Sequence, residues 1–390
     1  MPGKQKSGYL PTLDGWRAIA IFAVLLDHAV GYSSLRSVPS ILKLTRVGPN
    51  GVSLFFAISG FLICSRLLEE ERMFGRISLA GFYIRRACRI LPPAMFYLFA
   101  VGIISFFGLI AVTPLEWWSS VFFFRNYVSP NWVGYGWGGY TIHYWSLAVE
   151  EHFYLLWPTA LVLLGKFRAR WFAVGLALTI AAWRMWEFQA HWLDRIIPNL
   201  LIGCRTDIRL DALLLGCLAA LLLEKDSART WFAENFKTWM WLLCVLAYAI
   251  LQLTQKVRTY SIVESALLPL IIAGTVYGQR MWVNTLLESR PLKWVGRLSY
   301  SLYLWQQLFS VPQPGSKLGW IQHWPWSIGM IFLMAWLSYK LVERPFIRLG
   351  HRLAPPPTEG REDLGQKRGH SEEYSPHSAT PSGEDIQLSA

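Results

Sequence analysis

The chain has 390 residues, of which 53% are hydrophobic and 16% are charged, and its mean hydropathy is +0.31. A soluble domain carries about 25% charged residues, so this composition disfavours an ordinary soluble protein. A net charge of +12 is compatible with a protein that binds nucleic acid. The basic residues, however, lie scattered in short loops, which argues against a nucleic-acid-binding module.

The apolar residues fall in runs of roughly 17 to 25 residues, the length that a helix needs to cross about 30 Å of hydrocarbon. We therefore predict an all-α, polytopic membrane protein with about ten transmembrane helices. The predicted segments, in chain order, are residues 14–32, 51–68, 92–112, 143–165, 171–188, 207–223, 239–254, 262–278, 296–311 and 324–342.

Lys and Arg in the short loops predict the orientation, because cytoplasmic loops carry an excess of basic residues. With the N-terminus inside, the inner loops include residues 72–89, 166–170, 225–237, 280–293 and 344–352. That side holds about twenty basic residues, against about ten on the other side. We therefore predict a multi-pass protein of the cell (inner) membrane with both termini in the cytoplasm.

The composition changes abruptly after residue 353. Residues 1–353 hold every apolar segment and form the predicted transmembrane domain. Residues 354–390 have no apolar run and are predicted to be a disordered cytoplasmic tail, since they cannot bury enough surface to offset their ordering entropy. The first apolar stretch lacks a small-residue cleavage pattern, so we expect no signal peptide. The five cysteines show no CxxC spacing, so we expect neither a disulfide framework nor a metal site.

The first predicted segment places Arg17 and His28 eleven positions apart. Eleven helical steps of about 100° return to within about 20° of the starting direction, so both side chains lie on one stripe, roughly 16 Å apart. His28 then lies past the middle of the bilayer, where an ionisable group is costly and marks a functional site. The alternative is a structural hydrogen bonder or an interfacial residue.

The second cluster contains Arg85, Arg86 and Arg89, at the predicted cytoplasmic boundary. Arg86 and Arg89 share one helix face, and the guanidinium fork suits phosphate oxygens. The residues are therefore candidates for binding an anionic cofactor or substrate. On spacing alone, positive-inside charge and binding to lipid headgroups explain them equally well.

The third cluster contains Glu150, Glu151 and His152, which open an otherwise apolar helix. Carboxylates are favourable at the positive end of a helix dipole, which is one explanation. The other is a carboxylate that pairs with His28 or with an arginine inside the bundle. Two weaker clusters lie at 205–211, where an Asp–Arg pair can simply neutralise a helix start, and at 299–307, where hydroxyls and amides can join helices.

Several ordered motifs resemble the acyltransferase-3 family of membrane-bound O-acyltransferases. The resemblance lies in Leu13-Asp-Gly-Trp-Arg17 with Asp27-His28-Ala29, residues 51–62, Arg86-x-x-Arg89-x-x-Pro92, Trp145-Ser-Leu-Ala-Val-Glu-Glu151, Asp207-x-Arg-x-Asp211, residues 298–305 and Val342-Glu-Arg-Pro-Phe346. The matches follow the family's order and cover about residues 9–350. Three positions depart from the family pattern. Ser53 stands where the family usually has an acidic residue, Gln306 stands where it often has a His, and His152 stands where Gln is common.

The resemblance implies ten helices and transfer of an acyl group, usually acetyl, from acyl-CoA to a hydroxyl of a cell-surface polysaccharide, lipid-linked sugar or secondary metabolite. Acyl-CoA is then a donor substrate, and no permanently bound cofactor is expected. The resemblance carries the family's Arg–His role onto Arg17 and His28, and its double-arginine role onto Arg86 and Arg89. Many relatives append a soluble hydrolase-like domain, which we expect to be absent here or supplied by another protein.

Each of these residues has a predicted role in an acyltransferase reaction. His28 is the expected base, or carries the acyl group covalently, and Arg86, Arg89 and Arg85 are expected to bind the CoA phosphates. Arg17 is expected to bind donor phosphate or to orient a carboxylate, and Glu150 or Glu151 to fix the tautomer of His28. The alternative is a transporter or flippase for a lipid-linked sugar or small metabolite, in which buried His, Asp and Arg relay protons. Many transporters have a repeat between the two halves of the chain, and this sequence shows none, which argues against the transporter alternative. The acceptor, the acyl chain and the oligomeric state stay open.

Overall fold

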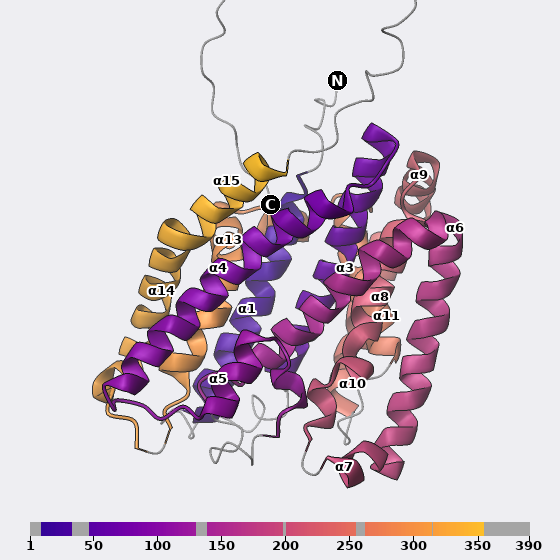
Figure 1. Ribbon diagram of the computed structural model, residues 1–390. Helices are drawn as coiled ribbons and strands as arrows, with labels where there is room; N and C mark the ends of the chain where they lie inside the picture. Colours follow the sequence, from indigo (N-terminus) through magenta and orange to yellow (C-terminus); the bar gives the residue numbers. More distant parts are fainter. Residues whose placement is uncertain are drawn as a thin grey trace, which may run out of the picture.

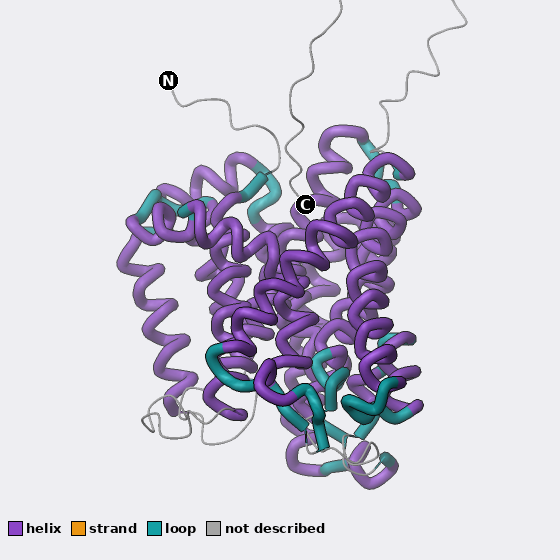
Figure 2. The backbone as a smooth tube through the Cα atoms, turned by 90° about the vertical axis from the view of Figure 1, so that its left-hand side faces the viewer, coloured by secondary structure: helices purple, strands orange, loops and turns teal. Residues whose placement is uncertain are grey.

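The computed structural model describes residues 9–32, 47–129, 139–197, 200–254, 262–313 and 315–354, which form a bundle of helices with no strand among them (Figure 1, Figure 2). The all-α prediction is confirmed for these residues. Apart from Ala354, the predicted cytoplasmic tail lies outside the described residues. Both ends of the described chain, the start of α1 and α15, lie at the same end of the bundle (Figure 1).

Each of the ten predicted apolar segments coincides largely with a helix, although α4 ends before residues 107–112 of the third segment. The long helices are α1 (Pro11–Tyr32), α3 (Val47–Phe74), α4 (Leu79–Phe106), α6 (Tyr144–Ala190), α8 (Thr206–Leu222), α10 (Thr238–Thr254), α11 (Ile262–Val276), α13 (Arg290–Ser310) and α14 (Trp326–Ser338). The shorter ones are α5 (Pro114–Val121), α7 (Trp192–Ile196), α9 (Asp226–Asn235), α12 (Trp282–Leu287) and α15 (Arg344–Leu353). Short 3-10 turns η2 (Arg125–Tyr127), η5 (Ile202–Cys204) and η6 (Gly319–Gln322) and a π-helical turn η7 (Tyr339–Glu343) complete the described elements.

The apolar helices indicate a membrane protein. Two described helices, Gly48–Phe74 and Leu79–Phe106, are each long and apolar enough to cross a bilayer alone, and α9 with α10, bent by 83°, would make a third span. The outer surface carries large exposed apolar side chains, among them Phe106, Leu163 and Trp282. Such a surface suits a lipid environment, because lipid tails do not penalise it. The number of ten crossings and the orientation remain predictions.

A sharp kink in α6 replaces the predicted inner loop at 166–170. Gly165 has non-helical dihedral angles, φ 69° and ψ 164°, inside the element Tyr144–Ala190. Glycine adopts positive φ at little cost because it has no Cβ, so one residue turns the chain. The two arms of α6 therefore rise and descend on either side of this residue (Figure 1). The fourth and fifth predicted segments are these two arms.

Buried ion pairs attach the second arm of α6 to α8. Arg184 pairs with Asp211 at 2.9 Å, and both side chains are 2% exposed. Arg205 pairs with Glu187 at 2.7 Å. Arg205 also donates to Asp207 at 3.1 Å, which is the neutralised helix start predicted for this stretch. These pairs are structural, because each charge already has its partner.

Close backbone contacts join α1, α3, α8 and α13 at the centre of the bundle, where a small residue stands at each crossing. A Cβ added to Gly296 of α13 would lie 1.9 Å from the Asp14 carbonyl oxygen of α1. A Cβ added to Gly60 of α3 would lie 2.0 Å from the Leu213 carbonyl oxygen of α8. These four helices can therefore approach more closely than bulkier residues would permit.

Replacement of Gly296 tests this packing. We expect Gly296→Ala to destabilise the protein by about 1–3 kcal/mol, because the added methyl group meets backbone rather than a movable side chain. Gly175→Ala in α6 is the matched control, since nothing lies within 4 Å of its Cβ position. Thermal unfolding in detergent should show a lower midpoint for Gly296→Ala and an unchanged or higher midpoint for Gly175→Ala. Equal midpoints for the two variants would contradict the close α1–α13 contact.

Candidate active site

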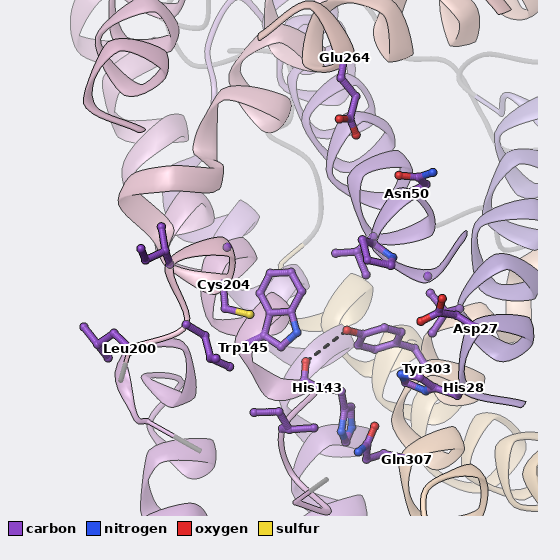
Figure 3. A pocket seen from close by; sticks show the side chains of 18 of the residues that line it. Asp27, His28, Asn50, His143, Trp145, Leu200, Cys204, Glu264, Tyr303 and Gln307 are labelled. Atoms are coloured by element: carbon purple, nitrogen blue, oxygen red, sulfur yellow. Dashed lines mark hydrogen bonds between the residues drawn. The ribbon is translucent and has the colours of Figure 1, made fainter. Parts of the chain in front are cut away.

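Two adjoining cavities lie inside the bundle. The larger one, the histidine cavity, has a volume of about 670 Å³ and is lined by polar side chains that include Asp27, His28, Asn50, His143, His191, Gln252, Glu264, Tyr303 and Gln307 (Figure 3). The smaller one, the arginine cavity, has a volume of about 70 Å³ and is lined by Arg17, Ser59, Arg86, Arg89, Ser146, Glu150, Ser299, Tyr300, Tyr303 and apolar residues. Val52 and Tyr303 belong to both walls.

Helix α1 connects the two cavities. Arg17, in its first half, lines the arginine cavity, and His28, near its end, lines the histidine cavity. Asp14 pairs with Arg17 at 3.6 Å and accepts a hydrogen bond from Tyr9 at 2.8 Å, so Arg17 is held from one side. The eleven-residue spacing thus gives one helix a functional group in each cavity, as its periodicity predicts.

A relay of buried amides fixes the tautomer of His28. Gln307 donates through Nε2 to the Gly139 carbonyl at 3.1 Å, and its Oε1 accepts from Gln306 Nε2 at 3.5 Å. This orientation turns Gln306 Oε1 toward His28 Nδ1, to which it is hydrogen bonded. A carboxamide oxygen only accepts, so the proton resides on Nδ1 and the lone pair that a base needs is on Nε2.

A buried platform beneath this relay positions the Gly139 carbonyl. Glu116 of α5 forms a capping box with Thr113, and a Cβ added to Gly139 would lie 2.2 Å from Glu116 Oε1. Burial raises the pKa of the Glu116 carboxyl, although the nearby Arg125 guanidinium lowers it. Glu116 and Arg125 are both almost completely inaccessible to solvent. Glu116 of α5 therefore packs against Gly139, whose carbonyl ends the relay, a contact that the sequence did not suggest.

The arginine cavity concentrates positive charge. The charges of Arg17 and Arg86 both act on Arg89, and the carboxylate that opposes them is Glu343. Arg86 lies over the ring of Tyr154, with 3.8 Å between Cζ and the ring centroid, and its Nε has no hydrogen-bond partner among the described residues. Glu150 lines the same space and Glu151 lies beside Arg86, so carboxylates offset part of this positive charge. The planar donors of the three guanidinium groups suit an anionic ligand.

The remaining predicted site residues lie in different places, and only one of them lines a cavity. Arg85 is bonded to Glu70 at 2.8 Å and to the Ala354 carbonyl at 2.9 Å, and it is not part of the cavity lining. Glu150 lines the arginine cavity and accepts from Ser59 at 2.9 Å. Glu151 lies beside Arg86 outside both cavity linings, and the Nδ1 partner of His28 is Gln306 rather than either carboxylate.

His152 and Ser53, which depart from the family pattern, are each hydrogen bonded to a nearby residue. His152 is hydrogen bonded through Nδ1 to the hydroxyl of Thr206 at 2.7 Å. Ser53 accepts from Arg209 at 3.0 Å, and the carboxylate that acts on Arg209 here belongs to Glu264 of α11. An acidic group is thus present near Arg209, but it comes from another helix than the family pattern would suggest.

Sequence reasoning missed Glu343 as a site residue. It lies in the π-helical turn η7, is 1% exposed, and accepts from Ser301 of α13 at 2.8 Å. Its charge acts on Arg89, so it partly neutralises the arginine cavity. The signal was present in the Val342-Glu-Arg-Pro-Phe346 motif, but a π-helical turn cannot be recognised from hydrophobic periodicity.

His143 was also missed, and Tyr303 was noted only as one of the hydroxyls at 299–307. His143, at the start of α6, is 3% exposed, lines the histidine cavity, and has no hydrogen-bond partner among the described residues for either ring nitrogen. The Tyr303 hydroxyl is hydrogen bonded to the Ser146 hydroxyl at 2.5 Å, and it lies 3.3 Å from the His143 carbonyl oxygen, to which it can donate (Figure 3). An imidazole and a phenol thus join His28 at one wall of the cavity.

Comparison with known proteins agrees with the motif resemblance. Residues 10–343 match the family model described as an acyltransferase domain. The O-acetyltransferase OatA of Staphylococcus aureus strain NCTC 8325 is 29% identical over 367 residues, which are 88% of this chain and 58% of the relative. OatA of strain COL matches to the same extent. The chain therefore spans 58% of the length of these relatives. No solved structure matches.

The match is one continuous block that begins at the first helix and ends in the π-helical turn η7. It contains every residue that lines the two cavities, because the lining residues fall between Arg17 and Gln307. The resemblance drawn from the motifs is confirmed, and the chain belongs to the acyltransferase-3 family.

Proposed function

We propose that the protein is a membrane-bound O-acyltransferase that moves an acetyl group from acetyl-CoA to a hydroxyl of a glycan. The observation that carries this proposal is the adjacency of the two cavities, one rich in arginine and one containing His28, across the shared residues Val52 and Tyr303. Family membership and the O-acetyltransferase relatives support the same reaction class.

The arginine cavity is the proposed donor side. CoA is polyanionic, and Arg17, Arg86 and Arg89 supply the planar donors that bind phosphate oxygens well. The volume of about 70 Å³ admits a narrow chain rather than a nucleotide, so the phosphates would be held at its mouth while the thioester arm enters. The thioester carbonyl then reaches toward Tyr303 and the histidine cavity.

The histidine cavity is the proposed acceptor side. The acceptor hydroxyl gives its proton to His28 Nε2 while its oxygen attacks the thioester carbonyl carbon. N–H donors around the carbonyl oxygen stabilise the resulting oxyanion, and His143 is placed to contribute one. Collapse of the tetrahedral intermediate breaks the C–S bond, and the departing sulfur takes the proton back from His28. The products are an acetyl ester and free CoA.

The position of the histidine cavity along the bundle supports access of the acceptor from the end opposite the start of α1. The wall of the histidine cavity includes Phe188, His191 and residues 200–204, at the end of α6 and near α7. Helix α7 lies at the end of the bundle away from the start of α1 (Figure 1). With the predicted orientation, cytoplasmic acetyl-CoA and an extracytoplasmic glycan would meet inside the protein.

Acceptor-dependent release of CoA tests the proposed reaction. Purified protein in detergent, incubated with labelled acetyl-CoA and oligosaccharide acceptors, should release free CoA and transfer label to the sugar in equal amounts. A transporter or flippase would release no CoA and would leave the label on the donor. Absence of transfer to every hydroxyl acceptor, with intact binding of acetyl-CoA, would contradict the acyltransferase assignment.

A further inference from the structure

The wall of the histidine cavity opposite His28 carries polar groups that the proposed chemistry does not use. Glu264 of α11 is 3% exposed and lines the cavity, and its Oε1 has no hydrogen-bond partner among the described residues. Gln252 of α10 lines the same cavity, and its buried Nε2 makes no hydrogen bond of good geometry to a described residue, although the Gln252 and Ser53 side chains lie close enough to the Glu264 carboxylate to interact with it. Burying an unsatisfied polar atom is unfavourable, so a ligand that satisfies both atoms gains affinity.

The two atoms are chemically complementary. Glu264 Oε1 accepts hydrogen bonds, and Gln252 Nε2 donates them. A sugar hydroxyl or an N-acyl amide both donates and accepts, so one such group, or two neighbouring ones, satisfies both atoms at once. Asn50 adds an amide that faces the same space, and the indole of Trp145 forms part of the side wall, next to Cys204 (Figure 3).

The charge of Glu264 disfavours an acidic ligand at this wall. Glu264 is the carboxylate here, and the guanidinium that acts on it, Arg209, already donates to Ser53 at 3.0 Å. Among the residues that the structure describes, the cavity lining contains no Lys or Arg, although Asp27 and Glu264 are both in it. A ligand carboxylate or phosphate at this wall would face the buried Glu264 carboxylate, and the guanidinium nearby, Arg209, already interacts with Glu264 and Ser53. A neutral polyhydroxylated ligand meets no such repulsion.

We propose that Glu264 and Gln252 form an acceptor-recognition subsite for an uncharged sugar unit, at the end of the histidine cavity opposite the reacting hydroxyl at His28. This inference rests on the proposed acyl transfer for its purpose, because it assigns the acceptor class of the same site. The subsite would hold a neighbouring sugar of the chain while the reacting hydroxyl lies at the other end. A volume of about 670 Å³ is within the range of cavities that enclose ligands of this size.

Glu264→Gln tests the subsite with the full chain in detergent. Maltotriose and chitotriose serve as neutral probes and trigalacturonate as the acidic probe, and their binding is measured by calorimetry alongside acceptor-dependent CoA release. Wild type should prefer the neutral probes. Glu264→Gln should bind them roughly 10- to 100-fold more weakly and should lose the discrimination against trigalacturonate, with the KM for acetyl-CoA unchanged. A purely structural role for Glu264 would not shift the neutral-to-acidic preference.

Two further variants keep the result interpretable. Gln252→Leu removes the donor without changing charge, so it should weaken neutral binding and retain the discrimination, even if Glu264→Gln fails to fold. Glu234→Gln, on the short helix α9 away from both cavity linings, should match wild type. Unchanged neutral affinity in both subsite variants, or a wild-type preference for trigalacturonate, would overturn the proposal. Neutral sugars that bind without any release of CoA would instead overturn the acyltransferase function and leave the subsite standing.

Discussion

His28→Asn should reduce acceptor-dependent transfer by about 10²- to 10⁴-fold, the usual contribution of a positioned general base. The Asn side-chain amide can take the place of the imidazole Nδ1–H and keep the hydrogen bond to Gln306, so the relay to Gly139 stays intact. It has no counterpart to Nε2, so the acceptor proton loses its receiver. Initial rates of CoA release with saturating acetyl-CoA measure the effect.

Donor binding separates this catalytic effect from misfolding. Because His28 lines the histidine cavity and not the arginine cavity, the Kd for CoA should stay within about twofold of wild type. A variant that retains at least one fifth of wild-type turnover would show that another group takes the proton. A parallel loss of CoA affinity and turnover would show instead that His28 supports the structure of both cavities.

Arg89→Gln should raise the KM for acetyl-CoA roughly 10- to 150-fold, which corresponds to the loss of a charge-assisted hydrogen bond worth about 1.5–3 kcal/mol. Arg89 lies among the charges of Arg17, Arg86 and Glu343, so its removal weakens the field that attracts the donor. The turnover number at saturating donor should change much less, because His28 is untouched. Steady-state kinetics with varied acetyl-CoA, together with direct CoA binding, measure the split between KM and kcat.

Arg85→Gln is the sharpest comparison for this variant. Its guanidinium bonds Glu70 and the Ala354 carbonyl, outside the lining of the arginine cavity, although the sequence spacing placed it with Arg86 and Arg89. We expect its donor KM to stay within about threefold of wild type. Equal weakening by Arg85→Gln and Arg89→Gln would mean that general surface charge, rather than the cavity, attracts the donor.

Much of the helical architecture follows from local patterns. Apolar runs mark each long helix, because a helix that faces lipid or packed neighbours must carry apolar side chains along most of its length. The turn inside α6 was expected to be a loop at 166–170, since basic residues cluster there. It is instead a kink at Gly165, because one glycine with positive φ can reverse the chain without a separate loop.

The sequence by itself determined that helices with apolar faces would form, and that α1 would carry Arg17 and His28 on one stripe, since both depend only on helical periodicity. Only the tertiary structure decided which groups face these two. Gln306 of α13 orients His28, Glu343 of a π-helical turn opposes Arg89, and Arg85 turns away to Glu70. The physical reason is that a hydrogen-bond or ion-pair partner from another helix depends on helix crossings, and close contacts such as that of Gly296 with Asp14 set those crossings.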